Sequence, residues 1–133
     1  MLASTGSLQP VATDSPTGPA ESPARMAEAQ LEAYNQGDLD AFCACYHPEV
    51  RVLAADGSVE LDGIAAFRGR YAPLFSRGGY GATVFGRLFV GGHCVDLEHW
   101  WREDPETGAR IEGTVLVRYS LRDGRIGVVQ FLR

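Results

Sequence analysis

The sequence predicts an α+β fold, in which a curved antiparallel sheet forms a cone-shaped barrel packed against three N-terminal helices. Helical periodicity is concentrated in the first half of the chain, and four long stretches of alternating apolar and polar residues follow after residue 81. Runs of helices followed by runs of strands are typical of α+β domains. A meander this long in a chain of 133 residues has to bend over the helices, which leaves a cone open at one end.

Residues 1–23 are expected to form a disordered or extended N-terminal tail, ahead of one domain that spans residues 24–133. The tail contains four prolines with many Ser, Thr and Gly, and has almost no large apolar side chains to bury. It could be a flexible extension or could lie along a partner subunit, and the sequence leaves both interpretations open.

Three helices are expected before the meander. Ser22 is suited to cap the first, over residues 24–36, and a second short helix is expected over residues 39–46. The third runs from residue 64 to about residue 75 with one apolar face, and Pro73 should disturb its last turn.

Strand patterns fill the rest of the chain. Residues 50–54 and 58–61 alternate as two short strands joined by the turn Asp56-Gly57. The four strands of the meander are expected, with Gly- and Asp-rich turns between them, over residues 82–90, 94–102, 110–121 and 125–132.

Composition excludes two classes of protein. The formal net charge is −5, and 12 basic residues are dispersed among 17 acidic ones, which argues against nucleic-acid binding. No apolar run approaches the roughly 18 residues of a membrane span, and the N-terminus lacks the features of a signal peptide. A cytoplasmic protein with no membrane partner is expected.

The cysteines and histidines do not predict a metal site. Three cysteines form no CxxC pair and are expected to be reduced, mostly buried thiols. His47, His93 and His99 have no ligand spacing with them, so no metal and no cofactor are expected. His47 could lie at a pocket rim or be a solvated loop residue.

The strand around residue 98 carries the most informative pattern. Because side chains on a strand alternate between faces, Asp96, Glu98 and Trp100 share one face. If this strand pairs with the next across the turn at residues 104–108, Glu98 lies opposite Val115 and Asp96 lies opposite Val117.

This inner face, with helix residues above it, predicts an aromatic pocket with a few polar groups, as small-molecule sites usually have. Ligand-pocket residues are expected to be Gln30, Tyr34, Tyr46, Phe67, Tyr71, Trp100, Val117, Tyr119 and Phe131.

Three segments of the chain, AQLEAYNQGDLDAF(x)3YHPEV, LDGIAAFRGRY and VRYSLRDGRIGVVQFLR, carry a resemblance to a known family. They span residues 29–50, 61–71 and 117–133. The chain resembles the nuclear transport factor 2-like superfamily, which includes SnoaL-like polyketide cyclases and ketosteroid isomerases. The resemblance implies the cone fold but leaves the chemistry open, because one scaffold hosts isomerases, cyclases, hydrolases and binding modules.

The resemblance argues against the ketosteroid isomerase mechanism, which needs an aspartate base and an oxyanion hole made by a tyrosine and a protonated aspartic acid. In alignment, the base falls at Ala54 and the oxyanion tyrosine at Gln30. The second aspartic acid falls at Leu116 or Val117, so all three functional groups are absent.

SnoaL-like proteins often carry an acid/base residue on this part of the sheet, and the resemblance places that role on Asp96 first and Glu98 second. Two carboxylates about 7 Å apart can separate each other's pKa if both are buried. The alternative is that each carboxylate binds Arg, Tyr or backbone groups and only holds the sheet. Tyr46 and Tyr71, which support the oxyanion tyrosine in the isomerases, are retained.

The resemblance thus implies a small-molecule-binding SnoaL-like domain, an isomerase, cyclase or hydrolase that acts on a largely apolar substrate by carboxylate acid/base chemistry. The alternative is a non-catalytic ligand-binding or dimerisation domain. An open pocket with a water-linked Asp96 favours the enzyme, whereas a pocket plugged by Trp100, Phe131 and Tyr71 favours the structural role.

The opposite face of the sheet predicts a homodimer. It presents Leu97, His99, Trp101, Leu116 and Arg118, which together are too apolar for a fully wetted surface. The resemblance implies sheet-to-sheet dimerisation, as is common in relatives with this fold.

Overall fold

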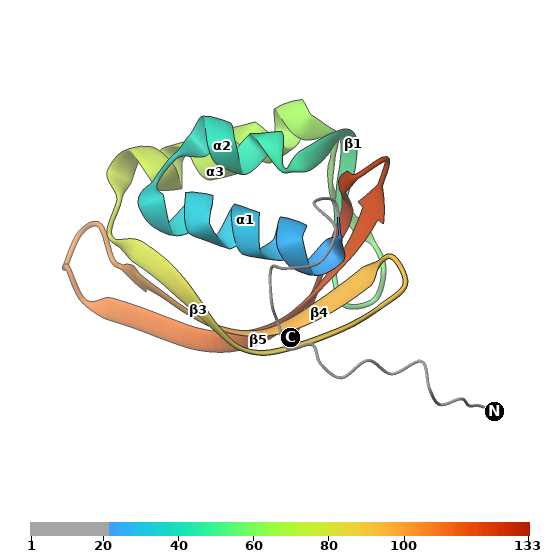
Figure 1. The fold of residues 1–133 in the computed structure, drawn as a ribbon. Helices are drawn as coiled ribbons and strands as arrows, with labels where there is room; N and C mark the ends of the chain where they lie inside the picture. Colours follow the sequence, from blue (N-terminus) through green and yellow to red (C-terminus); the bar gives the residue numbers. More distant parts are fainter. Residues whose placement is uncertain (1–21) are drawn as a thin grey trace.

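The computed structural model describes residues 22–133, in which three helices cover the concave face of a strongly curved six-stranded sheet (Figure 1). The expected tail lies outside the described residues except for Ser22 and Pro23, which begin the first helix. In chain order the elements are α1 (Pro23–Gln36), α2 (Leu39–Ala44), β1 (Tyr46–Leu53), β2 (Val59–Asp62), α3 (Ile64–Arg77), β3 (Tyr80–Val90), β4 (His93–Glu103), β5 (Arg110–Arg122) and β6 (Arg125–Leu132).

The sheet confirms the α+β cone but is mixed and unclosed. Its strand order is β2-β1-β6-β5-β4-β3, and all neighbours are antiparallel except β1 and β6, which are parallel. The chain crosses by α3 to the far edge and runs back through the meander, so that β6 reaches β1 in the same direction. The expectation of a purely antiparallel sheet is therefore wrong at this one pair.

Local sequence signals explain most helix ends. The Ser22 hydroxyl accepts a hydrogen bond from the Arg25 N–H at 3.2 Å, and Gly37 ends α1 with φ 72°, a conformation that glycine adopts without strain. α2 is shorter than expected because β1 already begins at Tyr46. α3 continues past Pro73 to Arg77, so the expected disturbance does not end the helix.

An aromatic cluster under the helices forms the centre of the core. Phe42 of α2 is 2% exposed and stacks on Phe67 of α3, with 5.5 Å between the ring centroids. Tyr46 of β1 packs against the same Phe67 ring at 4.3 Å.

The three cysteines are buried and free, as the sequence predicts. None of the helices in residues 22–133 is long and apolar enough to span a membrane.

Candidate functional site

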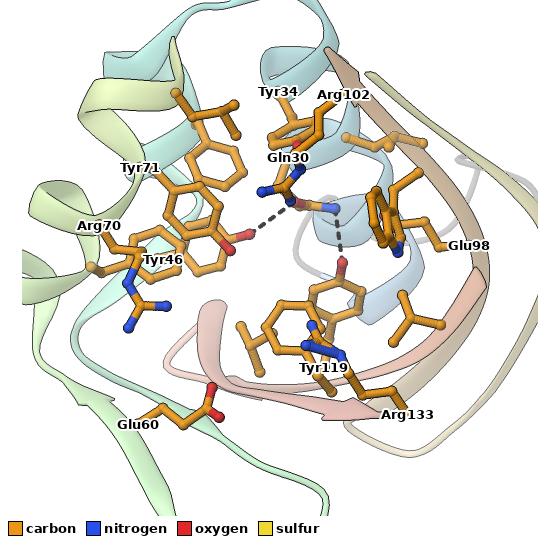
Figure 2. Close-up of a pocket in the computed structure, with 18 of the residues that line it drawn as sticks. Gln30, Tyr34, Tyr46, Glu60, Arg70, Tyr71, Glu98, Arg102, Tyr119 and Arg133 are labelled. Carbon is orange, nitrogen blue, oxygen red and sulfur yellow. Dashed lines mark hydrogen bonds between the residues drawn. The ribbon is translucent and has the colours of Figure 1, made fainter. Parts of the chain in front are cut away.

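A cavity of about 1020 Å³ lies between the helices and the concave face of the sheet (Figure 2). Its lining runs from buried Gln30 and Tyr119 to exposed Arg70 and Ile111, so it extends from the interior to solvent. Eight of the nine expected pocket residues line it, and Val117, 1% exposed in the core, does not. The strand pairs Glu98–Val115 and Asp96–Val117 form as expected.

Gln30 of α1 forms hydrogen bonds that join α1 to β1 and β5 at the buried end of the cavity. Its amide nitrogen donates to the Ala27 carbonyl at 3.0 Å and to the Tyr119 hydroxyl at 3.1 Å (Figure 2). Its amide oxygen accepts from the Tyr46 hydroxyl at 2.8 Å. Because a carbonyl only accepts, the bond to Ala27 fixes which end of the amide faces each tyrosine. Both donors of Gln30 are therefore used within the protein.

This orientation leaves the Tyr119 hydroxyl hydrogen available. Tyr119 accepts from Gln30, and within residues 22–133 it has no acceptor for its own proton. The side chain is 4% exposed and lines the cavity. Burial first, and then the Glu98 carboxylate, raise the pKa of Tyr119 well above its ordinary value, so the phenol stays protonated. It can donate a hydrogen bond to a ligand oxygen.

Glu98 of β4 places a carboxyl group in the cavity without a protein partner. It is partly buried, and no hydrogen bond or ion pair within residues 22–133 engages it. Its cross-strand neighbours, Val84 and Val115, are apolar. Burial, with a smaller contribution from the Asp96 carboxylate, raises the pKa of Glu98 to about 7. Both protonation states are therefore populated near neutral pH.

The other tyrosines of the cavity are held protonated as well. Burial and the nearby Glu98 carboxylate raise the pKa of Tyr71 to about 12. Burial first, and then Tyr71, raise the pKa of Tyr34. Tyr34 and Tyr71 are thus neutral groups in the wall of the cavity that also holds Glu98.

Asp96 faces the same side of the sheet as Glu98 but does not line the cavity. It is completely buried, and its two carboxylate oxygens accept from Arg87 at 2.7 and 3.0 Å. Arg87 also donates to Glu28 of α1 at 2.9 Å, so the cluster joins β3, β4 and α1. This arrangement matches the structural alternative for Asp96 and favours Glu98 as the acid/base candidate.

The charged rim of the cavity is the part that was not expected from the sequence. It consists of Glu60, Arg70, Arg77, Arg102 and Arg133. Two signals could have revealed it. Arg102 continues the alternation of Glu98 and Trp100 on β4, and Arg70 and Arg77 are seven residues apart on one face of α3.

The histidines lie outside the cavity lining. His47 lies in β1 rather than in a loop, where its ring accepts from the Glu49 N–H at 2.9 Å and approaches Asp123 at 3.4 Å. His93 lies 2.8 Å from the Ser120 hydroxyl, and His99 lies 2.7 Å from Glu112. No group of three or more His, Cys, Asp or Glu side chains suited to a metal ion occurs in the described part of the chain.

Comparison with known proteins defines the family. A family model described as a SnoaL-like domain matches residues 27–128. No curated protein sequence gives a significant match.

Solved structures share the fold. An uncharacterized cystatin fold protein from Novosphingobium aromaticivorans is 24% identical, with a TM-score of 0.76 over 84% of this chain and 98% of that one. The Δ5-3-ketosteroid isomerase of Mycobacterium sp. is 13% identical, with a TM-score of 0.72 over 82% and 90%. An LEH-like epoxide hydrolase from M. tuberculosis is 18% identical, with a TM-score of 0.70 over 80% and 78%. At these identities the similarity shows the fold alone.

Proposed function

Because the chain belongs to the SnoaL-like domain family, we propose that it binds a small, largely apolar molecule in the cavity and acts on it by acid/base chemistry. The observation that supports this proposal is the unpaired carboxyl group of Glu98, with its pKa near 7, inside an aromatic cavity. Structures with this fold include an isomerase, an epoxide hydrolase and a putative polyketide cyclase, which supports an isomerisation, a hydrolysis or a cyclisation as the proposed reaction.

In this mechanism Glu98 moves a proton and Tyr119 stabilises charge. The ionised carboxylate of Glu98 accepts a proton from a substrate carbon or from a water molecule, and later returns it. The free hydroxyl hydrogen of Tyr119 donates to a substrate oxygen on which negative charge develops. Gln30 holds Tyr119 in place through the bond at 3.1 Å.

The ketosteroid isomerase mechanism does not fit these residues. Ala54, at the position of the aspartate base, has no ionisable group, and its carbonyl accepts from Gln130 at 3.1 Å. Gln30, at the position of the oxyanion tyrosine, uses both amide hydrogens on Ala27 and Tyr119. Acid/base chemistry in this cavity is therefore assigned to Glu98 of β4 instead of the position of Ala54.

A binding screen followed by product analysis tests the proposal. Steroid, terpene and polyketide-like compounds are screened by thermal shift, and each compound that binds is incubated with the protein and examined by mass spectrometry. A gain of one water identifies a hydrolase, whereas a new isomer of unchanged mass identifies an isomerase or cyclase. Glu98→Gln is expected to bind the same compound with at least a hundredfold slower turnover. Full turnover by this variant would refute the role of Glu98.

A second candidate is a non-catalytic ligand-binding domain. It is favoured by the Arg87–Asp96 pair, which removes one of the two expected carboxylates from the chemistry. Trp100, Phe131 and Tyr71 line the cavity and do not fill it, which supports a ligand-binding role over a purely structural one. Compounds that bind equally to the wild type and Glu98→Gln, with no product from either, would establish this candidate.

We also propose a cytoplasmic location, which the three free, buried cysteines support, because disulfides are rare in reducing compartments.

A further inference from the structure

The rim of the cavity is rich in arginine although the chain is acidic overall. The formal net charge is −5, yet four arginines line the cavity: Arg70, Arg77, Arg102 and Arg133. They come from α3, from β4 and from the residue after β6, and Figure 2 shows Arg70, Arg102 and Arg133 around the cavity. Among the described residues of the lining, the only exposed carboxylate side chain is that of Glu60. The opening is therefore a local positive region.

These arginines have no carboxylate partner within residues 22–133. Elsewhere in the described chain, carboxylates within 4 Å neutralise Arg51, Arg68, Arg87, Arg110 and Arg122. Two of the rim arginines instead lie over aromatic rings of the cavity wall. The guanidinium of Arg102 is 5.1 Å from the centre of the Trp100 ring, and that of Arg133 is 5.0 Å from the Phe131 ring.

Stacking of this kind leaves a guanidinium able to bind an anion. An arginine that lies over an aromatic ring is held in position by the ring, while its N–H groups remain along the edge of the planar group. Such N–H groups match the oxygens of a carboxylate, sulfonate or phosphate. The rim thus combines unpaired positive charge with partly fixed donors.

We propose that the ligand of this cavity is an amphipathic organic anion, whose carboxylate, sulfonate or phosphate group binds at the arginine rim while its apolar body fills the aromatic interior. The inference deepens the proposed function and rests on it, because it specifies the class of small molecule that enters the same cavity.

Charge also sets the direction in which such a ligand enters. The Glu98 carboxylate repels an anionic group, and the rim arginines attract it, so the head group stays at the opening. The apolar end then lies against Glu98 and the free hydroxyl of Tyr119. The substrate is expected to react at a position remote from its anionic group.

Two fluorescent probes with nearly the same body test the inference. The anionic probe is 1-anilinonaphthalene-8-sulfonate, and the neutral probe is N-phenyl-1-naphthylamine, which lacks the sulfonate. The variant Arg70→Gln/Arg77→Gln/Arg102→Gln is expected to bind the anionic probe about tenfold more weakly than the wild type and the neutral probe equally well. The control Arg51→Gln/Arg68→Gln/Arg122→Gln removes the same charge outside the cavity and is expected to change neither affinity. Circular dichroism verifies that both variants are folded.

The outcomes separate the inference from the proposed function. The inference would be overturned if both triple variants lost the same affinity for the anionic probe, or if neither lost any. In either case, the proposed function would still stand if the neutral probe bound to the wild type. Arginine-dependent binding of the anionic probe without binding of the neutral probe would support the inference and contradict an apolar ligand.

Competition identifies the head group. Decanoate, decane-1-sulfonate and decyl phosphate are compared with decanol, below their micellar concentrations, as competitors of the anionic probe. At least one anion is expected to displace the probe about tenfold better than decanol. If decanol competes as well as all three anions, the inference is wrong.

Discussion

At the scale of single residues, Asp96 and Glu98 show how a neighbour decides the role of a carboxylate. The two residues lie on the same face of β4, one pleat apart. Asp96 lies across from Arg87 and is bonded by it through both oxygens, whereas Glu98 lies across from Val84. The same functional group is therefore structural at one position and free in the cavity at the next.

Removal of the Asp96 carboxylate is expected to destabilise the protein strongly. Asp96→Ala leaves the largely buried guanidinium of Arg87 with only Glu28, which is half exposed, and the free energy of unfolding should fall by about 3 kcal/mol. Urea unfolding followed by circular dichroism measures the change. Asp62→Ala, which breaks an exposed pair with Arg51, serves as the control and should cost less than about 1 kcal/mol. A similar small loss for both variants would show that the Arg87 cluster is not a stabilising element.

Glu98 is expected to weaken the fold above neutral pH. Its pKa of about 7 lies above the ordinary value of 4.5, so the folded state binds its proton more tightly than the unfolded state. Stability therefore falls as the pH rises from about 4.5 to 7, by an amount on the order of 3 kcal/mol. Glu98→Gln, which stays neutral, should be more stable than the wild type at pH ~8.5, with most of that gain lost at pH ~5.5. Urea unfolding at both values measures it, and a gain independent of pH would contradict the raised pKa.

At the scale of elements, the hairpin of β4 and β5 could be predicted from the sequence because local signals define it. Alternation sets the two faces, and the turn is built by Asp104, whose carboxylate accepts from the Glu106 N–H at 2.8 Å, and by Gly108 at φ 74°. These signals were enough to predict that Asp96 pairs with Val117 and that Glu98 pairs with Val115.

The contact that engages Asp96 could not be predicted in this way, because it depends on an irregularity in the neighbouring strand. β3 pairs Val84 with Glu98 and Gly86 with Leu97, so Phe85 is an extra residue in a bulge. In a regular strand, Arg87 would lie across from Val95 on the outer face. The bulge turns it inward onto Asp96. The parallel pairing of β1 with β6 was missed for a different reason. It joins two strands that are distant in the sequence, and no local signal reports such a pairing.

Gly113 of β5 is expected to keep the cavity open. It lies across from Trp100, and a Cβ atom there would be 2.7 Å from the indole, so a larger residue must push the ring away. Gly113→Val should displace the indole into the cavity and weaken binding of N-phenyl-1-naphthylamine by about tenfold. The same strain should lower the free energy of unfolding by about 1–3 kcal/mol. Fluorescence titration measures the affinity.

Gly81 of β3 provides a matched control for this variant. A Cβ atom at Gly81 would be 2.6 Å from Trp101, which points away from the cavity on the outer face. Gly81→Val should therefore cause similar strain without a loss of probe affinity. Equal loss of affinity in the two variants would mean that general destabilisation, and not the Trp100 ring, controls binding.

At the scale of the whole molecule, the two faces of the sheet differ in what covers them. The helices cover the concave face (Figure 1). The outer face of β3, β4 and β5 carries exposed apolar side chains. Leu88 is 68% and Leu116 is 41% exposed there, beside Leu97 and Trp101. Exposed apolar side chains on one face of the sheet favour contact with another protein.

We propose that a second copy of the chain covers this face, in a symmetric homodimer with the sheets packed against each other. Leu116 of β5 lies across from Leu97 of β4 on this face. In a symmetric dimer the same patch of both subunits forms the interface, so a substitution at Leu116 changes the interface at two places. Leu116→Glu should therefore convert a dimer at micromolar concentration to a monomer in light scattering, because each interface would bury two carboxylates. Val59→Glu makes the same change on β2, where the side chain is 50% exposed at the other edge of the sheet, and should leave the dimer intact. A monomeric mass for the wild type would refute the dimer, and dissociation by both variants would show that added charge alone, and not the outer face, controls assembly.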